Sequence, residues 1–296
     1  MLSLVSAVGY GGSDYAAGLA SRRVSVLRVT IIAEGVGVLV MLLVVPWVSG
    51  QAPSLVPIGW GAAAGFGGVL GTLALYQGFR HADFSVAGPL SAVASAGFAV
   101  LAGLLFGEHP GGLSLAGIAL ALPAIIGVSA SPRAVPEAAG ELVPGSQGTL
   151  HARASGHHLA GVAWGLAAGA GFGVLFIGLN RAGSSDDLWP AVVAQLTALL
   201  AVGVAGLVRG ELRPLEARHT WLAVTAGITG AAGTLCYFVA THDGLLAITA
   251  VVTSLYPAVT ILLARILLGE RLTRARLGGL VLAVGAVVLI ALGGTG

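Results

Sequence analysis

The sequence is dominated by long apolar runs in which charged residues are almost absent. Of its 296 residues, 56% are hydrophobic and only 9% are charged. A soluble all-helical protein with unusually apolar helices is therefore the poorer interpretation, because such a protein needs a polar exterior. A segment that crosses a bilayer must satisfy its own backbone hydrogen bonds, as a helix of about 20 apolar residues or a strand of a closed barrel. The runs are continuous and do not alternate, which predicts helices.

Ten such segments are expected, separated by polar, glycine-rich or proline-containing breaks. They are 2–20, 25–48, 58–79, 84–106, 112–130, 159–180, 188–208, 220–241, 245–268 and 276–293. The sequence thus predicts an all-α integral membrane protein of ten transmembrane helices, whose first partner is the lipid bilayer. The net charge of +2 is spread over many loops, so no nucleic-acid partner is indicated. The oligomeric state does not follow from the sequence.

An internal repeat is the second strong pattern. A shift of 162 residues, from Gly9 to Gly171, places Gly9-Tyr10-Gly11 on Gly171-Phe172-Gly173 and Gly71-Thr72-Leu73 on Gly233-Thr234-Leu235. We interpret residues 1–130 and 159–296 as two five-helix copies joined by a linker at 131–158. An odd number of crossings makes the second copy enter the membrane from the opposite side, so the repeats are expected to be inverted. Inverted repeats are typical of secondary transporters, whose substrate site lies near the midplane where the copies meet.

The motifs of the second half also resemble a known family. The order Leu255-Tyr256-Pro257, Leu268-Gly269-Glu270-Arg271-Leu272 and Gly278-Gly279-Leu280 resembles the repeat of the EamA family in the drug/metabolite transporter superfamily. Gly88-Pro89-Leu90 and Leu105-Phe106-Gly107-Glu108 show it more faintly in the first half, and Tyr10 to Tyr15 with Ser21-Arg22-Arg23 is similar to one bacterial branch.

The resemblance implies a ten-helix carrier, proton-linked or driven by another gradient and often an exporter, for amino acids or other small metabolites. We expect a multi-pass protein of the cell inner (plasma) membrane. One departure is that the ungapped counterpart of Pro257 is Ser95, while Pro89 lies earlier in its helix. The two helix breaks are therefore not expected to be equivalent.

Two carboxyl groups lie within predicted membrane helices and lead the candidate site. Asp14 and Glu34 have no basic residue three or four positions away. A charge at such a depth costs about 2.5–3.5 kcal/mol on insertion scales, so it normally faces a cavity, has a partner or is protonated. The repeat register places Asp14 on Phe176 and Glu34 on Leu196, beside Gln195, so the acidic function belongs to the first copy. The alternative is that each carboxyl is a hydrogen-bonded structural group.

The predicted substrate site combines these two acids with the polar side chains on neighbouring apolar helices. Its members are Tyr10, Asp14, Tyr15, Glu34, Tyr76, Gln77, Gln195, Tyr237, Thr253, Ser254 and Tyr256. Burial favours the neutral form of a carboxyl group, so Glu34, the deeper of the two, is expected to couple transport to protons. Pro257 frees a backbone carbonyl or simply kinks its helix. Most glycines are expected to pack helices together, while Gly9, Gly11, Gly171 and Gly173 are also expected to keep a central cavity open.

Other polar residues are assigned structural roles. Glu108 and Glu270 each precede a helix and suit its positive end. The single cysteine excludes a disulfide within the chain and any multi-cysteine metal site, and the histidines of the linker are interpreted as solvated. No cofactor, metal or catalytic motif is recognised, and nothing supports ATP-driven transport. A secondary carrier is favoured, with a polytopic channel or an intramembrane enzyme as the alternative.

Orientation has two conflicting indications. Arg181 is the only arginine outside loops 1/2, 3/4, 5/6, 7/8 and 9/10 and the adjoining helix ends. The positive-inside rule then places these loops in the cytoplasm and both termini outside. Proteins of the family that this chain resembles more usually have both termini inside. We adopt the charge argument because it is based on this chain.

Overall fold

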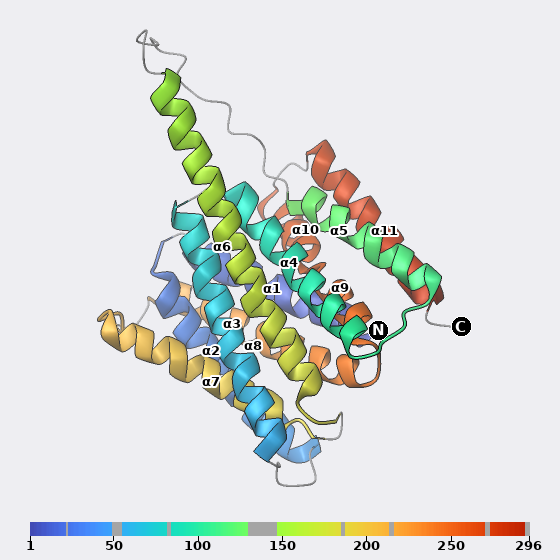
Figure 1. Cartoon of the computed structure of the whole chain (residues 1–296). Coiled ribbons are helices and arrows are strands. Elements are labelled where there is room, and N and C mark those ends of the chain that lie inside the picture. Colours follow the sequence, from blue (N-terminus) through green and yellow to red (C-terminus); the bar gives the residue numbers. More distant parts are fainter. Residues whose placement is uncertain are drawn as a thin grey trace.

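The computed structural model describes residues 1–21, 23–48, 55–81, 84–129, 147–184, 187–212, 216–269 and 273–293. Within these residues the regular structure is helical, without strands. The helices are α1 (Leu2–Ser21), α2 (Val26–Val48), α3 (Leu55–His81), α4 (Phe84–Leu105), α5 (Gly112–Ser129), α6 (Gln147–Arg181), α7 (Trp189–Val208), α8 (Ala217–His242), α9 (Leu246–Thr253), α10 (Tyr256–Leu268) and α11 (Arg274–Gly293). They form a single bundle with α5 and α11 side by side at one edge (Figure 1).

Each predicted segment is occupied by helix, with two differences. The helix predicted at 159–180 begins earlier, because α6 starts at Gln147, within the segment expected to be linker. The rest of the predicted linker, residues 131–146, lies outside the described residues. The segment predicted at 245–268 consists of two helices, α9 and α10, which are separated at Ser254 and Leu255.

The break between α9 and α10 follows from Pro257, which lies in the first turn of α10. A proline has no N–H and clashes with the carbonyl four residues earlier, so it favours the start of a helix over its interior. The corresponding part of α4 is one uninterrupted helix, which confirms that the two copies differ at this point. The interruption goes beyond a simple kink.

The lengths and composition of the helices identify a membrane protein. Among the described residues, seven helical segments are long and apolar enough to cross a membrane: Val26–Trp47, Leu55–Leu75, Ala160–Arg181, Trp189–Val208, Ala217–His242, Leu246–Leu268 and Arg274–Gly293. Leu90–Leu105 and Gly112–Val128 are apolar but shorter. The first helix, with its glycines, serines and Asp14, is in neither group. The expected total of ten crossings therefore stays a prediction.

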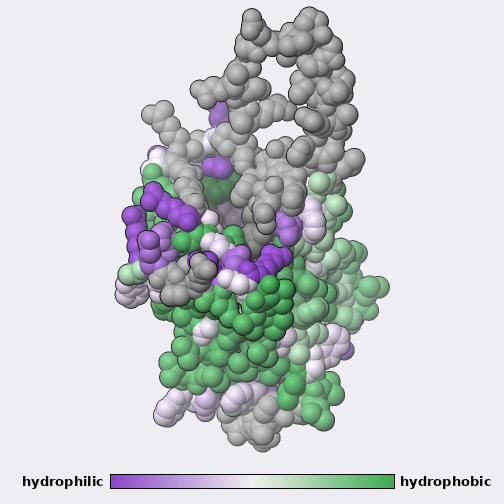
Figure 2. All heavy atoms as spheres, turned by 90° about the vertical axis from the view of Figure 1, so that its left-hand side faces the viewer, coloured by the Kyte–Doolittle hydropathy of each residue, from purple (hydrophilic) through white to green (hydrophobic). Residues whose placement is uncertain are grey.

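The outer surface has the character that lipid requires. Large apolar side chains are exposed on α2 and α7, including Leu43 at 72% and Leu200 at 67%. Figure 2 shows a broad apolar band on this face, with more polar residues above and below it. Such a band matches a hydrocarbon layer between two polar interfaces.

The two halves of the chain interlock, because the most extensive helix contacts join one half to the other. Helix α3 packs along α6, α1 along α8, and α5 along α11. The 162-residue shift maps α1 onto α6, α3 onto α8 and α5 onto α11. If the two halves are exchanged, the contact between α3 and α6 therefore becomes the contact between α8 and α1, and the contact between α5 and α11 is converted into itself.

Two close helix crossings between the halves are formed by glycines that the repeat shift aligns. A Cβ atom added at Gly9 would lie 2.7 Å from the Cα of Gly233, and one at Gly171 would lie 2.6 Å from the Cα of Gly71. These two crossings are equivalent under the repeat shift. The absence of side chains lets the helix backbones touch, as in other tightly packed membrane helices. Gly9 and Gly171 therefore hold the halves together and are not in the cavity lining, contrary to part of the sequence expectation.

Two further glycines explain the Gly-Glu motif that follows α4 and α10. Gly107 has φ 87° and Gly269 has φ 67°, a left-handed conformation that is strained for other residues. Glycine in this conformation ends a helix without strain. Glu108 directly follows Gly107. Its carboxylate accepts hydrogen bonds from the backbone N–H groups of Leu246 at 2.5 Å and Ala247 at 2.9 Å.

Glu108 therefore caps the N-terminus of α9, in the other half of the chain. The carboxylate satisfies two N–H groups that have no partner within the helix and interacts favourably with the positive end of its dipole. The predicted structural role of Glu108 is confirmed. The prediction that its carboxylate interacts with the N-terminus of α5 is wrong, because it caps α9 instead. Glu270 lies outside the described residues.

Candidate functional site

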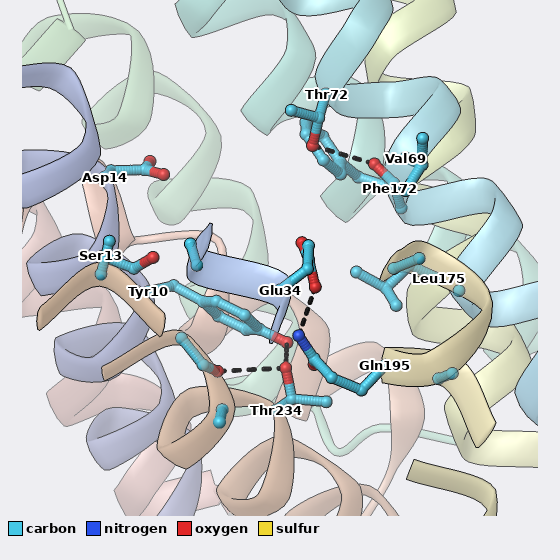
Figure 3. Close-up of a pocket in the computed structure, with 18 of the residues that line it drawn as sticks. Tyr10, Ser13, Asp14, Glu34, Val69, Thr72, Phe172, Leu175, Gln195 and Thr234 are labelled. Carbon is cyan, nitrogen blue, oxygen red and sulfur yellow. Dashed lines mark hydrogen bonds between the residues drawn. The ribbon is translucent and has the colours of Figure 1, made fainter. Parts of the chain in front are cut away.

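A cavity of about 190 Å³ lies between the two halves of the chain (Figure 3). It is surrounded by α1, α2 and α3 from the first half and α6, α7 and α8 from the second, with single contributions from α4 and α10. Many of its residues are repeat equivalents: Tyr10 and Phe172, Gly65 and Gly227, Gly68 and Gly230, and Thr72 and Thr234. The cavity is therefore built from matching positions of both copies.

Four of the lining residues are glycines, two from each half: Gly65, Gly68, Gly227 and Gly230. Gly65 and Gly227 also allow close approach between helices, with Gly65 facing the carbonyl of Ala194 and Gly227 facing that of Ala33. These contacts bring α3 against α7 and α8 against α2. The cavity therefore lies beside close crossings between helices of the two halves.

Glu34 on α2 and Gln195 on α7 are joined by a hydrogen bond across the cavity. The amide nitrogen of Gln195 donates to one carboxylate oxygen of Glu34. Both residues line the cavity, and Glu34 is half-buried. The repeat shift places Gln195 on Ala33, so this link between the halves has no second copy.

A second polar contact joins α1 to α8. The hydroxyl oxygens of Tyr10 and Thr234 are 3.0 Å apart, and the Thr234 hydroxyl donates to the carbonyl of Gly230 at 3.1 Å. Because the threonine has only one proton to donate, Tyr10 is the donor between the two side chains. In the other half Thr72 donates to the Gly68 carbonyl at 3.0 Å, and phenylalanine occupies the position equivalent to Tyr10.

Asp14 is exposed and borders the cavity from α1. Figure 3 shows its carboxylate on the side of the cavity opposite Phe172 and Leu175. No hydrogen bond or ion pair to this carboxylate is present among the described residues, in contrast to Glu34. No arginine, lysine or histidine is among the residues that line the cavity in the described part of the chain.

The structure brings together part of the predicted substrate site. Tyr10, Asp14, Glu34, Gln195 and Tyr256 line the cavity. Tyr15 and Gln77 are described but are not in its lining, and the side chain of Tyr76 lies outside the described residues.

The remaining predicted residues have other surroundings. Tyr237 is fully buried; its ring stacks on Phe176 at 4.7 Å between centroids, and its hydroxyl donates to the Phe176 carbonyl at 3.2 Å. Thr253 is buried and donates to the Ser3 carbonyl at 3.5 Å. Ser254 is buried beside the helix break. None of these three lines the cavity, and the interruption before Pro257 contributes Tyr256 to it instead.

Several lining residues were missed from the sequence. They include Ser13, Thr72, Ser95, Phe172, Leu175, Phe176 and Thr234. The repeat itself contained a signal for some of them, because Thr72, Phe172 and Thr234 belong to the motifs that the shift aligns. The apolar members give no such signal on an apolar helix.

The interlocked halves, the apolar outer band and the cavity with its few polar side chains define a multi-pass membrane protein with a ligand-sized space between two related halves. The EamA-like transporter family matches residues 1–130 and 159–292 of this sequence. The chain belongs to the EamA-like transporter family. No curated protein matches the sequence.

A solved structure named only "Crystal structure of protein" has the same fold. It is similar over 97% of this chain and 98% of its own, with a TM-score of 0.71 and 16% sequence identity. At that level of identity the likeness supports the fold alone.

Proposed function

We propose that this chain is a secondary active transporter that exports a small metabolite, such as an amino acid or a drug-like compound. The observation that supports it most is the cavity between the halves, which is lined by equivalent positions of both copies. In the proposed mechanism the cavity opens alternately to the two sides of the membrane. The family membership, which concerns transporters, agrees with this proposal.

The proposed architecture is ten crossings in two inverted five-helix repeats. Two related halves that contact each other through the same pairs of helices can exchange roles, so that an inward-open and an outward-open state have similar energies. We place the protein in the cell inner (plasma) membrane, with the arginine-rich loops on the cytoplasmic side.

Proton coupling is assigned to Glu34. This carboxyl lies in the cavity at the junction of α2 and α7, where a movement of one half against the other changes its contact with Gln195. In each cycle the Glu34 carboxyl group would leave Gln195 while the cavity opens to one side and bind it again when the cavity opens to the other. The carboxyl group can then take up a proton on one side and release it on the other.

The test is Glu34→Gln in purified full-length protein reconstituted into liposomes. Glutamine keeps the size and hydrogen bonding of the side chain but does not titrate. The expected result is loss of accumulation driven by an imposed pH gradient, while exchange of labelled substrate between equal concentrations on the two sides continues. A pooled-metabolite screen with and without the pH gradient supplies the substrate for this assay.

The matched control is Glu216→Gln, which makes the same chemical change on a side chain that is 88% exposed and outside the cavity. Gradient-driven accumulation at the wild-type rate in Glu34→Gln would contradict the coupling role. A flux that does not saturate with substrate would indicate a channel and would contradict the carrier mechanism. Parallel loss of exchange, expression and melting temperature would assign Glu34 a purely structural role.

A further inference from the structure

We propose that the cavity selects small organic cations: an ammonium or guanidinium head group attached to an apolar, preferably ring-containing body. This inference rests on the proposed transport function and narrows its substrate class. Its basis is the way in which the two copies differ around a cavity that they otherwise build alike.

The charge of the lining favours a cation. Asp14 and Glu34 both border the cavity, and none of its described lining residues is basic. A substrate carboxylate or sulfonate would face these two acids without a positive partner. A charge taken out of water without a partner is strongly disfavoured, whereas a charge of opposite sign to the site is attracted.

The break between α9 and α10 does not supply an anion site. Helix N-termini that point into a transporter cavity can bind anionic groups through free N–H groups. Here Pro257 has no N–H, and the N–H of Ala258 already bonds to the carbonyl of Leu255 at 2.9 Å. Neither of these two positions of α10 therefore offers a free N–H group to an anion.

The opposite walls of the cavity differ in polarity. On α1 the lining residues are Tyr10, Ser13 and Asp14, and their repeat equivalents on α6 are Phe172, Leu175 and Phe176. Figure 3 shows Ser13 and Asp14 on one side of the cavity and Phe172 and Leu175 on the other. A ligand with a charged head and an apolar body matches both walls in a single orientation.

The two carboxylates have different partners. Glu34 already accepts a hydrogen bond from Gln195, while Asp14 has no partner among the described residues. Asp14 is therefore the group available to a substrate cation. The volume of about 190 Å³ exceeds the roughly 150 Å³ of an engineered cavity that holds benzene, so one ring fits, with the head group toward the exposed carboxylate of Asp14.

The test uses three probes that share one benzyl body: benzyltrimethylammonium, the uncharged benzyl methyl sulfone and the anionic phenylmethanesulfonate. The quaternary ammonium group keeps its charge at every pH, so its binding does not depend on titration of the probe. Dissociation constants are measured by calorimetry on the purified full-length protein, and passage is measured by counterflow of labelled probe in liposomes. The same head groups on a cyclohexylmethyl body form a second series.

The expected result is that the ammonium probe binds about 10-fold or more tightly than the sulfone, and the sulfone more tightly than the sulfonate. Asp14→Asn should weaken binding of the ammonium probe about 10-fold or more and leave the sulfone unchanged. The matched control is Asp243→Asn, an exposed position outside the cavity, which should change neither.

The ranking of the probes by the wild-type protein tests the inference even if a variant fails to fold. Equal affinity for the three probes, a preference for the sulfonate or no binding of the ammonium probe would overturn it. Passage of the sulfonate without the ammonium probe would overturn the ligand class but support transport. Binding of the ammonium probe without counterflow would support the ligand class and contradict the transport function.

Discussion

The glycine crossings between the halves give the sharpest prediction about stability. Replacing Gly171 by alanine would place a Cβ atom 2.5 Å from the backbone nitrogen of Gly71 and 2.7 Å from the carbonyl oxygen of Gly67. Both contacts are to backbone, so no side chain can rotate away. Ordinary contacts of this kind lie near 3.5–4.0 Å, so α3 and α6 would have to separate by about 1 Å.

The cost follows from this displacement. Overpacking of a tight interface destabilises by about 1–3 kcal/mol. At roughly 2–4 °C per kcal/mol for a chain of this size, the melting temperature should fall by about 2–12 °C. Gly9→Ala, at the equivalent crossing on Gly233, should have an effect of similar size. Gly18→Ala is the matched control in α1, because nothing lies within 4 Å of an added Cβ there.

Alanine also favours a helix over glycine by about 0.5–1 kcal/mol, so Gly18→Ala should leave the melting temperature unchanged or raise it slightly. The assay heats detergent-purified protein and follows the fraction that remains monodisperse on size exclusion. If Gly9→Ala and Gly171→Ala melt together with Gly18→Ala, then backbone contact at these crossings does not stabilise the assembly of the two halves.

Two other predictions concern a helix cap and the orientation in the membrane. Glu108→Gln has only one oxygen acceptor for the N–H groups of Leu246 and Ala247, so it should lose about 1–2 kcal/mol of stability, measured as a lower melting temperature than that of Glu216→Gln. An equal melting temperature for the two variants would exclude a stabilising cap. A C-terminal reporter that is active only in the cytoplasm should remain silent, in accordance with the arginine distribution, and a bright signal would reverse the proposed orientation.

Hydropathy was sufficient to locate the helices, because few backbone structures satisfy all their N–H and C=O groups inside a bilayer. It did not show how far a helix continues past the apolar run, as in α6, since the first residues of that helix are not apolar. The partner of Glu108 was also out of reach. Its position before α5 suggested a local cap, and only the packing of α4 against α9 reveals a partner in the other half of the chain.

The site was partly predictable because polar groups within apolar helices are costly and therefore few. This argument found Asp14, Glu34 and Gln195, which line the cavity. It failed for Tyr237, whose hydroxyl is satisfied by a backbone carbonyl within the core, a solution that sequence cannot distinguish from a ligand contact. It was silent on Phe176, because an aromatic residue that faces a cavity looks the same as one that faces a neighbouring helix.

The differences between the copies carry more information about function than their agreement. Gly9 and Gly171 have the same role at equivalent crossings, where any side chain would separate the helices. A few residues further along the same two helices, Asp14 and Phe176 give the cavity one charged and one apolar wall. On the proposed mechanism, the equivalent crossings let the halves exchange conformations at similar energy. The unequal walls fix which end of a ligand faces α1. A ligand held by its charged end would then keep one orientation while access changes sides, because the wall that binds this end belongs to only one copy.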